Sequence, residues 1–103
     1  MLAPTREIAT QAYHTIDCLG QNHARSVLII GGTSLVQNKR DLKRKKPAII
    51  VGTPGRILDL YSRGDLSAKT IQMLVLDEAD ELLQNETFRI QGSLGRLIFF
   101  LLF

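Results

Sequence analysis

Residues 48–56, Ala48-Ile49-Ile50-Val51-Gly52-Thr53-Pro54-Gly55-Arg56, decide the fold of this 103-residue chain. The first four residues are apolar and three of them are β-branched. A continuous apolar run of this length is typical of a strand buried on both faces, as in a parallel sheet. In the turn that follows, Thr53 can cap a helix through its hydroxyl, and Pro54 fits the first helical position, where a missing N–H costs nothing. The stretch therefore predicts a strand, a short turn and a helix.

The same order of elements recurs on both sides of this stretch. Further strands are expected at Ser26 to Ile30, at Met73 to Leu76 and at Leu2-Ala3, which is the stub of a strand. Helices are expected at Glu7 to Leu19, Leu35 to Lys45, Ile57 to Arg63 and Asp80 to about Arg89. Alternating strands and helices predict an α/β domain with a parallel sheet flanked by helices.

Each expected strand ends in a turn that offers a helix N-cap. The capping residues are expected to be Thr5, Ser34 (or Thr33), Thr53 and Asp80. In a parallel sheet the helix N-termini that follow the strands lie along one edge, where the ligands of open α/β sheets bind. Free N–H groups and the positive end of the helix dipole favour phosphate at such an edge. The pattern therefore predicts a phosphate-binding edge.

Two acids, Asp77 and Glu78, directly follow the apolar run that ends at Leu76. A buried strand that ends in two acids presents them at the sheet edge, beside any bound nucleotide. Phosphoryl transfer uses one carboxylate to hold hydrated magnesium and another to orient the attacking water. The alternative is that the acids only cap and charge-complement the following helix. Two acids after a buried strand are costly without a cation, which favours the nucleotide interpretation.

Two arginines, Arg6 and Arg56, lie in the first turn of an expected helix, at the wrong end for the helix dipole. A cation there is easier to explain if an anion lies between it and the backbone N–H groups. Glycines at Gly31-Gly32 and Gly55 let a sugar-phosphate chain approach the backbone closely, and arginine suits bidentate phosphate contact. The alternative is that Arg6 pairs with a nearby acid and that the glycines only serve tight turns.

Six basic residues lie between positions 39 and 46. They are Lys39, Arg40, Lys43, Arg44, Lys45 and Lys46. Most charge runs on helices are solvated faces, and a weak electrostatic contribution to nucleic-acid binding is the alternative. No aromatic residues are interleaved for base stacking, so any contact is expected with the nucleic-acid backbone and without sequence preference.

Composition excludes several other classes of protein. The formal net charge of +3 is compatible with an anionic partner without establishing one. Cys18 is the only cysteine, so the chain has no intrachain disulfide, and no Cys or His stands at zinc-ligand spacing. We expect Cys18 to be half-buried on a helix, and His14 and His23 to lie on the surface or at a helix end. An intracellular location, cytoplasmic or nuclear or both, is the default.

Neither end of the chain predicts a membrane segment. Residues 1–4 have neither the charged nor the apolar region of a signal peptide. The apolar tail, Leu97 to Phe103, is shorter than the roughly 20 apolar residues that cross a bilayer. The tail is expected to be either a strand or helix of a larger core or foreign sequence from a changed reading frame or a retained intron.

Together the turns closely resemble those of the D-E-A-D-box ATP-dependent RNA helicases. Pro4-Thr5-Arg6-Glu7-Ile8-Ala9 is similar to motif Ia of that family, Gly31-Gly32 to its paired-glycine motif and Thr53-Pro54-Gly55-Arg56 to motif Ib. Asp77-Glu78-Ala79-Asp80 is the motif that names the family. One such tetrapeptide is a weak signal, whereas four in the right order, each at a strand-to-helix turn, are specific.

The resemblance implies ATP and Mg²⁺ as cofactors and RNA as the partner. It implies that Asp77 holds magnesium, that Glu78 orients the hydrolytic water and that Asp80 links the nucleotide state to the grip on RNA. It also implies contacts with the RNA backbone. These would come from Thr5, Arg6, Gly32, Thr53, Gly55 and Arg56. The implied activity is unwinding of short RNA duplexes or remodelling of RNA–protein complexes.

The resemblance covers about Leu2 to Gln91, and it implies a partial RecA-like domain of the P-loop NTPase type. The P-loop strand and helix, the upstream glutamine motif, a Ser-Ala-Thr motif and the second RecA-like domain are not found in these 103 residues. We therefore expect residues 1–91 to be part of the first helicase domain and residues 92–103 to be a separate apolar tail. The chain alone is expected to be inactive in ATP hydrolysis and to fold marginally.

Three functions remain open on the sequence. The first is a fragment of an ATP-dependent RNA helicase, the second is a truncated RNA-binding or regulatory module without catalysis, and the third is a different α/β nucleotide-binding domain. Within the family, residues 71–83 resemble the initiation-factor helicases. Residues 85–88 and the basic helix resemble the gemin helicase of the SMN complex, which implies SMN-complex or other RNA–protein-complex partners.

Overall fold

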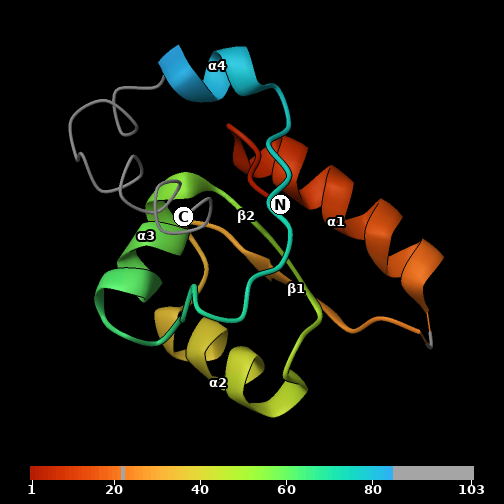
Figure 1. Ribbon diagram of the computed structural model, residues 1–103, viewed down its shortest axis with the longest axis vertical. Helices are drawn as coiled ribbons and strands as arrows, with labels where there is room; N and C mark the ends of the chain where they lie inside the picture. The colour runs from red at the N-terminus through yellow and green to blue at the C-terminus, as the bar shows by residue number, and fades with distance from the viewer. Residues whose placement is uncertain (22, 85–103) are drawn as a thin grey trace.

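Two short apolar segments form the parallel pair at the centre of the structure. The strand β1 (Ser26–Ile29) pairs with β2 (Ile49–Gly52), with Val27 opposite Ile50 and Ile29 opposite Gly52. This computed structural model describes residues 1–21 and 23–84. Figure 1 shows the two strands crossing the middle of the molecule between the helices. The predicted parallel sheet is confirmed.

Leu2 extends the sheet by a further position. It forms parallel bridges with Gly52 on one side and with Leu76 on the other. The Ala3 N–H donates to the Gly52 carbonyl oxygen at 3.0 Å, and the Leu2 N–H donates to the Val75 carbonyl oxygen at 2.8 Å. The order across the sheet is therefore β1, β2, Leu2 and Leu76, all parallel, and Leu2-Ala3 is the strand stub that the sequence predicts.

The prediction of a strand buried on both faces at Met73 to Leu76 is wrong. Only Leu76 forms a bridge, and the side chains of Met73 and Val75 are 79% and 44% exposed. The segment lies at the last position of the sheet, and no part of the described chain pairs with its outer edge. An apolar run is buried on both faces only where neighbouring layers cover both, and within the described residues one face of this segment stays uncovered.

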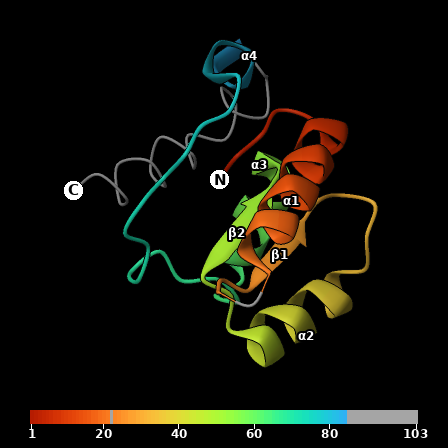
Figure 2. The same ribbon diagram turned by 90° about the vertical axis from the view of Figure 1, so that its right-hand side faces the viewer.

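Helices cover the two faces of the sheet. The helix α1 (Arg6–Gly20) packs on one face, and α2 (Leu35–Lys45) and α3 (Pro54–Ser62) lie on the other (Figures 1 and 2). A hydrophobic core lies on each face of the sheet, and successive strand residues point alternately into one core and the other. Val27 and Ile29 belong to the core beneath α3, whereas the residues next to them pack with Val51 and α1. The result is the three-layer α/β arrangement that the sequence predicts.

Two of the four predicted N-caps are confirmed. The Thr5 hydroxyl accepts from the Ile8 N–H at 3.2 Å, and the Ser34 hydroxyl accepts from the Gln37 N–H at 3.3 Å. Thr53 occupies the N-cap position of α3 but makes no side-chain capping hydrogen bond. Its backbone N–H continues the strand ladder by donating to the Ile29 carbonyl oxygen, and its side chain lines a surface groove instead.

Asp80 is not an N-cap, because α4 (Ala79–Gln84) begins one residue before it. The Leu82 N–H donates to the Glu78 carbonyl oxygen at 3.0 Å, so the helical ladder starts from Glu78 and places Asp80 inside the first turn. The expected continuation of this helix to Arg89 and the expected tail at residues 92–103 lie outside the described residues.

Three further observations concern the surface. Cys18 is exposed on α1 rather than half-buried, because it lies on the helix face turned away from the sheet. His14 and His23 are exposed, as expected. Within residues 1–84, no helix combines the length and the apolar character needed to cross a bilayer.

Candidate functional site

The four turns singled out in the sequence follow the carboxyl ends of four parallel sheet positions. They therefore lie along one edge of the sheet, which we call the rim: the diglycine turn (Gly31-Gly32), the Thr53 turn, the Thr5 turn and the acidic turn (Asp77-Glu78). Neighbouring strands lie about 4.8 Å apart, so the acidic turn is roughly 14 Å from the diglycine turn. The rim thus has an acidic end and a glycine-rich end.

Arg6 connects two turns of the rim. It is the first residue of α1, and its exposed side chain lies against the diglycine turn. A Cβ atom on Gly31 would stand 3.1 Å from Arg6 Nη2, and one on Gly32 would stand 2.7 Å from Arg6 Nη1. Gly32 also has a φ of 80°, which side chains rarely adopt. Both observations require glycine at position 32, and they place a guanidinium group beside exposed backbone.

Arg6 forms no ion pair with an acid in the described part of the chain, where the ion pairs are Lys39–Asp65 and Arg63–Asp59. The alternative that Arg6 serves a local ion pair is therefore not observed.

A groove of about 490 Å³ separates the Thr5 turn from the Thr53 turn. Its lining brings together Pro4, Thr5, Arg6, Glu7, Thr53, Pro54 and Gly55. Two segments almost fifty residues apart in the sequence therefore form one depression, which carries a cation, two hydroxyl groups and two helix N-termini. These groups are the ones that bind phosphate oxygens.

Arg56 is held by the protein rather than fully extended into solvent. Its Nη1 donates to the Thr33 carbonyl oxygen at 3.0 Å and to the Asn38 Oδ1 at 2.8 Å. The Thr33 hydroxyl in turn donates to the Ile30 carbonyl oxygen at 2.8 Å. Arg56 thereby ties the start of α3 to the turn before α2 and fixes the glycine-rich end of the rim.

Asn38 is a functional candidate that the sequence reasoning missed. Its side chain is only 4% exposed, and its amide oxygen accepts the hydrogen bond from Arg56. The signal was present, because Asn38 stands three residues after Leu35 and four before Leu42, on the face of α2 that packs against the core. A polar residue at such a position needs a partner.

Several carboxyl groups lie close together at and just after the acidic turn. Glu78 has a φ of 49°, in the left-handed region, and it is exposed. A side-chain hydrogen bond with Glu81 is the largest cause that raises the pKa of Glu78. Partial loss of hydration and repulsion from Glu81, Asp77 and Asp80 raise it further. A cation would relieve this crowding.

The Asp77 N–H donates to the Leu2 carbonyl oxygen at 2.9 Å, which fixes the acidic turn beside the Thr5 turn. Within the described residues, no three His, Cys, Asp or Glu side chains are grouped closely enough to hold a metal ion.

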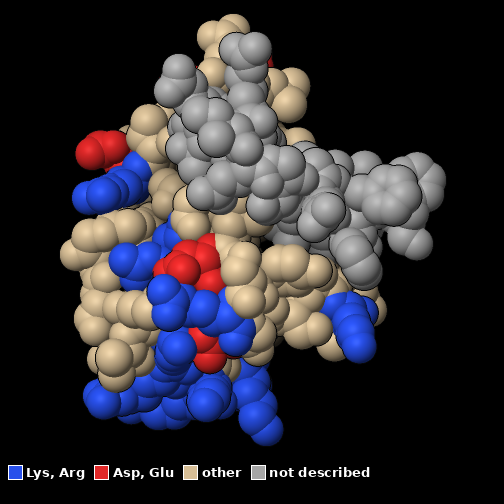
Figure 3. Space-filling model, turned by 90° about the vertical axis from the view of Figure 1, so that its left-hand side faces the viewer, with Lys and Arg blue, Asp and Glu red and all other residues tan. Residues whose placement is uncertain are grey.

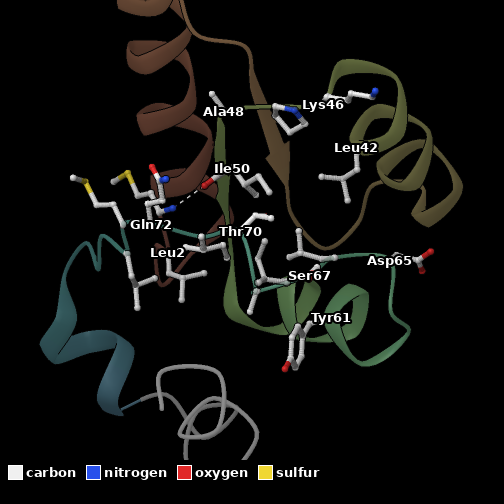
Figure 4. Close-up of a pocket in the computed structure, with 18 residues that line it drawn as sticks. Leu2, Leu42, Lys46, Ala48, Ile50, Tyr61, Asp65, Ser67, Thr70 and Gln72 are labelled. Carbon is white, nitrogen blue, oxygen red and sulfur yellow. Dashed lines mark hydrogen bonds between the residues drawn. The ribbon is translucent and has the colours of Figure 1, made fainter. Parts of the chain in front are cut away.

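A larger hollow, of about 530 Å³, lies apart from the rim. Figure 4 shows Leu2, Leu42, Ile50 and Tyr61 among the side chains around it, with Lys46 and Asp65 nearby. None of the predicted site residues lines it. Its lining mixes apolar side chains with Lys46, Asp65 and hydroxyl-bearing residues and includes none of the four turns of the rim, so the rim remains the candidate site.

Comparison with known proteins supports one family throughout. The DEAD/DEAH box helicase family matches residues 1–98. The ATP-dependent rRNA helicase RRP3 of Meyerozyma guilliermondii is 52% identical over 85 residues, which cover 81% of this chain and 18% of that protein. Its counterpart in Aspergillus terreus is 45% identical over 100 residues, which cover 95% of this chain and 22% of that protein. The chain thus spans about a fifth of the length of these relatives.

A solved structure has the same fold. The crystal structure of a hypothetical ATP-dependent RNA helicase from Sulfolobus tokodaii superposes with a TM-score of 0.70 at 32% sequence identity. The superposition covers 86% of this chain and 26% of that protein. The predicted partial RecA-like fold is therefore confirmed, while the boundary expected at residue 91 stays a prediction.

Proposed function

The chain belongs to the DEAD/DEAH box helicase family, and we propose that it is the part of an ATP-dependent RNA helicase that grips the RNA backbone beside the nucleotide. One observation carries the proposal. The rim gathers glycine-rich, hydroxyl-bearing and arginine-bearing turns at one end and a carboxylate turn at the other. A polynucleotide and a nucleoside triphosphate both present phosphate, and each end of the rim has groups suited to one of them.

The RNA-binding end consists of the turns around Thr5, Thr53 and Gly32. The groove between the first two offers hydroxyl groups and backbone N–H groups at the starts of α1 and α3, and Arg6 adds a positive charge. We propose that Thr5, Arg6, Gly32, Thr53, Gly55 and Arg56 contact the RNA backbone. Thr53 supports this assignment because its hydroxyl is not used in capping. These groups read phosphate and ribose rather than bases, so binding is independent of sequence.

The nucleotide end is the acidic turn. We propose that Asp77 holds hydrated Mg²⁺, that Glu78 orients the hydrolytic water and that Asp80 links the nucleotide state to the RNA grip. Mg²⁺ characteristically keeps several waters and binds through one or two carboxylates plus substrate phosphates. A single ligand from Asp77 therefore fits, although no described cluster could hold the ion alone. When bound, Mg²⁺ neutralises charge on the phosphates, and a cation beside Glu78 would also favour its ionised, water-orienting form.

The 103-residue chain by itself is proposed to bind RNA without turning over ATP. Its sequence has no Gly-Lys-Thr or Gly-Lys-Ser to cradle the triphosphate. Hydrolysis coupled to RNA unwinding or remodelling of RNA–protein complexes is proposed for the complete helicase. The second candidate is an RNA-binding or regulatory module, which would use the same rim without catalysis.

The relatives favour ribosomal RNA as the target, because two of them are named as rRNA helicases. We therefore propose a structured RNA within an RNA–protein complex, in the nucleus, the cytoplasm or both. Partners from the SMN complex remain an inference from the sequence resemblance alone.

The test is RNA binding by the 103-residue chain, measured by fluorescence anisotropy with a labelled single-stranded RNA. We expect Arg6→Gln to weaken binding roughly tenfold, since it removes one charge-assisted contact. Arg25→Gln is the matched control. It removes an equal, exposed charge just before β1, at the opposite edge of the sheet, and should leave affinity nearly unchanged. Equal losses in the two variants would show that net charge, not the rim, binds RNA.

A further inference from the structure

The basic run of residues 39–46 belongs neither to the rim nor to the hydrophobic core. It consists of Lys39, Arg40, Lys43, Arg44 and Lys45 on α2 and of Lys46 at the C-cap of the helix, and we call these six residues the cationic face of α2. Asp41 is the only acid within this run, and its carboxylate accepts a hydrogen bond from Gln37 at 3.0 Å. Figure 3 shows Lys and Arg side chains gathered over the lower part of the molecule, where α2 lies in Figure 1.

Most of these cations are directed to solvent. Arg40, Lys43, Arg44 and Lys46 are exposed, whereas Lys39 is partly covered and pairs with Asp65 at 2.8 Å. Among residues 1–84, the other five cations form no ion pair. The negative end of the helix dipole explains cations in the last turn of α2. It does not explain Arg40, which lies in the middle of the helix.

The cationic face continues the RNA-binding end of the rim. The helix α2 begins just after the diglycine turn, where Ser34 caps it, and Asn38 on its second turn accepts the hydrogen bond from Arg56. Lys39 is the next residue, and at 1.5 Å per residue the run extends about 10 Å further along the helix axis. A backbone that contacts Arg56 and the diglycine turn therefore meets these cations if it continues in that direction.

We propose that the cationic face of α2 is a second binding surface for RNA phosphates, which holds the RNA segment that leaves the rim past the diglycine turn. The inference rests on the proposed RNA-binding function of the rim. Its chemistry is that of backbone contact: lysine and arginine without aromatic residues for stacking. An acidic protein is a poorer fit, because protein interfaces depend on aromatic and apolar anchors. Val36 is the one large, exposed apolar side chain of α2.

The experiment compares two double variants of the 103-residue chain. Arg40→Gln/Lys43→Gln removes two exposed charges from the cationic face, and Arg25→Gln/Lys69→Gln removes two exposed charges from outside α2, close to the end of the basic run. Both pairs lower the net charge equally, and glutamine is a good helix former. Affinity for labelled oligouridylate is measured against salt concentration, once with a short RNA that fills only the rim and once with a longer RNA.

On the longer RNA, loss of two phosphate contacts should reduce the slope of log affinity against log salt by about 1.4, at roughly 0.7 for each contact. The control pair should change that slope much less, and neither pair should change binding of the short RNA. Circular dichroism checks the folding of each variant. If the glutamine pair loses helix, Arg40→Ala/Lys43→Ala replaces it, because alanine preserves helix best.

The outcomes separate the inference from the proposed function. If the two double variants have equal slopes of log affinity against log salt on the longer RNA, while Arg6→Gln still weakens RNA binding, the inference about α2 is wrong and the proposed function of the rim stands. The cationic face of α2 is then only a solvated surface. Polyglutamate serves as the probe for an acidic protein partner. If the Arg40/Lys43 double variant loses binding to polyglutamate but keeps its RNA binding, the cationic face binds an acidic protein and the inference is wrong. Absence of RNA binding by the unmodified chain would overturn both.

Discussion

Asn38 is the residue on which the glycine-rich end of the rim depends. Asn38→Leu keeps the volume but leaves the Arg56 guanidinium without its 2.8 Å acceptor. We expect this substitution to lower the free energy of unfolding by about 1.5–3 kcal/mol, the contribution of a hydrogen bond to a charged group. It should also weaken RNA binding, since Arg56 loses its anchor on α2. Asn38→Asp keeps an acceptor, so it should restore both quantities in denaturant titration and anisotropy. Failure of this rescue would contradict the role of the hydrogen bond.

Glu78 provides a prediction that depends on pH. Its folded-state pKa is raised above the ordinary value of 4.5, chiefly by the side-chain hydrogen bond with Glu81. A carboxyl group with a raised pKa favours the folded state while it is protonated, and that contribution is lost as pH rises through the folded pKa. Glu81→Gln replaces the carboxyl by an amide that can donate to ionised Glu78. It should therefore lower the Glu78 pKa and raise stability relative to the unmodified chain above that pH.

Carbon-detected NMR titration of the Glu78 carboxyl checks this prediction, together with melting temperatures on both sides of its pKa. Glu7→Gln, at the start of α1, is the control and should leave the titration of Glu78 in place. An unchanged Glu78 titration in Glu81→Gln would remove Glu81 as the cause.

At the scale of elements, Thr5 and Thr53 both occupy the N-cap position of a helix, but their hydroxyl groups have different roles. The Thr5 hydroxyl accepts from the Ile8 N–H, whereas the Thr53 hydroxyl caps nothing. Thr5→Ala should therefore cost about 1 kcal/mol of stability. Thr53→Ala should leave stability nearly unchanged and weaken RNA binding, because Thr53 lines the groove and its hydroxyl makes no capping hydrogen bond. Denaturant titration and anisotropy on the same two variants separate the effects, and equal destabilisation by both would contradict the assignment.

The elements also show what the sequence could predict. Short apolar runs ending in Gly, Pro or Thr located β1, β2, the Leu2 stub and the helices after them, because these signals are local. The segment at residues 73–76 was predicted to be buried on the same grounds, yet burial depends on the layers that cover a strand, which its own sequence does not record. The contacts of Arg6 with Gly32 and of Arg56 with Asn38 join residues 26 and 18 positions apart in the chain, so spacing could predict the rim but not which side chains meet there.

For the whole molecule, we expect the lateral edge of the sheet at residues 73–76 to promote association between chains. Met73 and Val75 are exposed apolar side chains on a segment whose outer edge has no partner among the described residues, and such edges promote association between chains. Val75→Lys should therefore reduce concentration-dependent association while preserving the melting temperature, as a charge on an edge strand opposes pairing.

Leu74→Lys is the matched substitution at the neighbouring position, where the side chain packs against the core. It should lower the melting temperature, because it places an ammonium group against the apolar residues beneath α3. Analytical ultracentrifugation and thermal melts distinguish the two effects. If Val75→Lys destabilises the chain as much as Leu74→Lys does, the outer face of this segment is covered in solution, and association must be driven from another part of the surface.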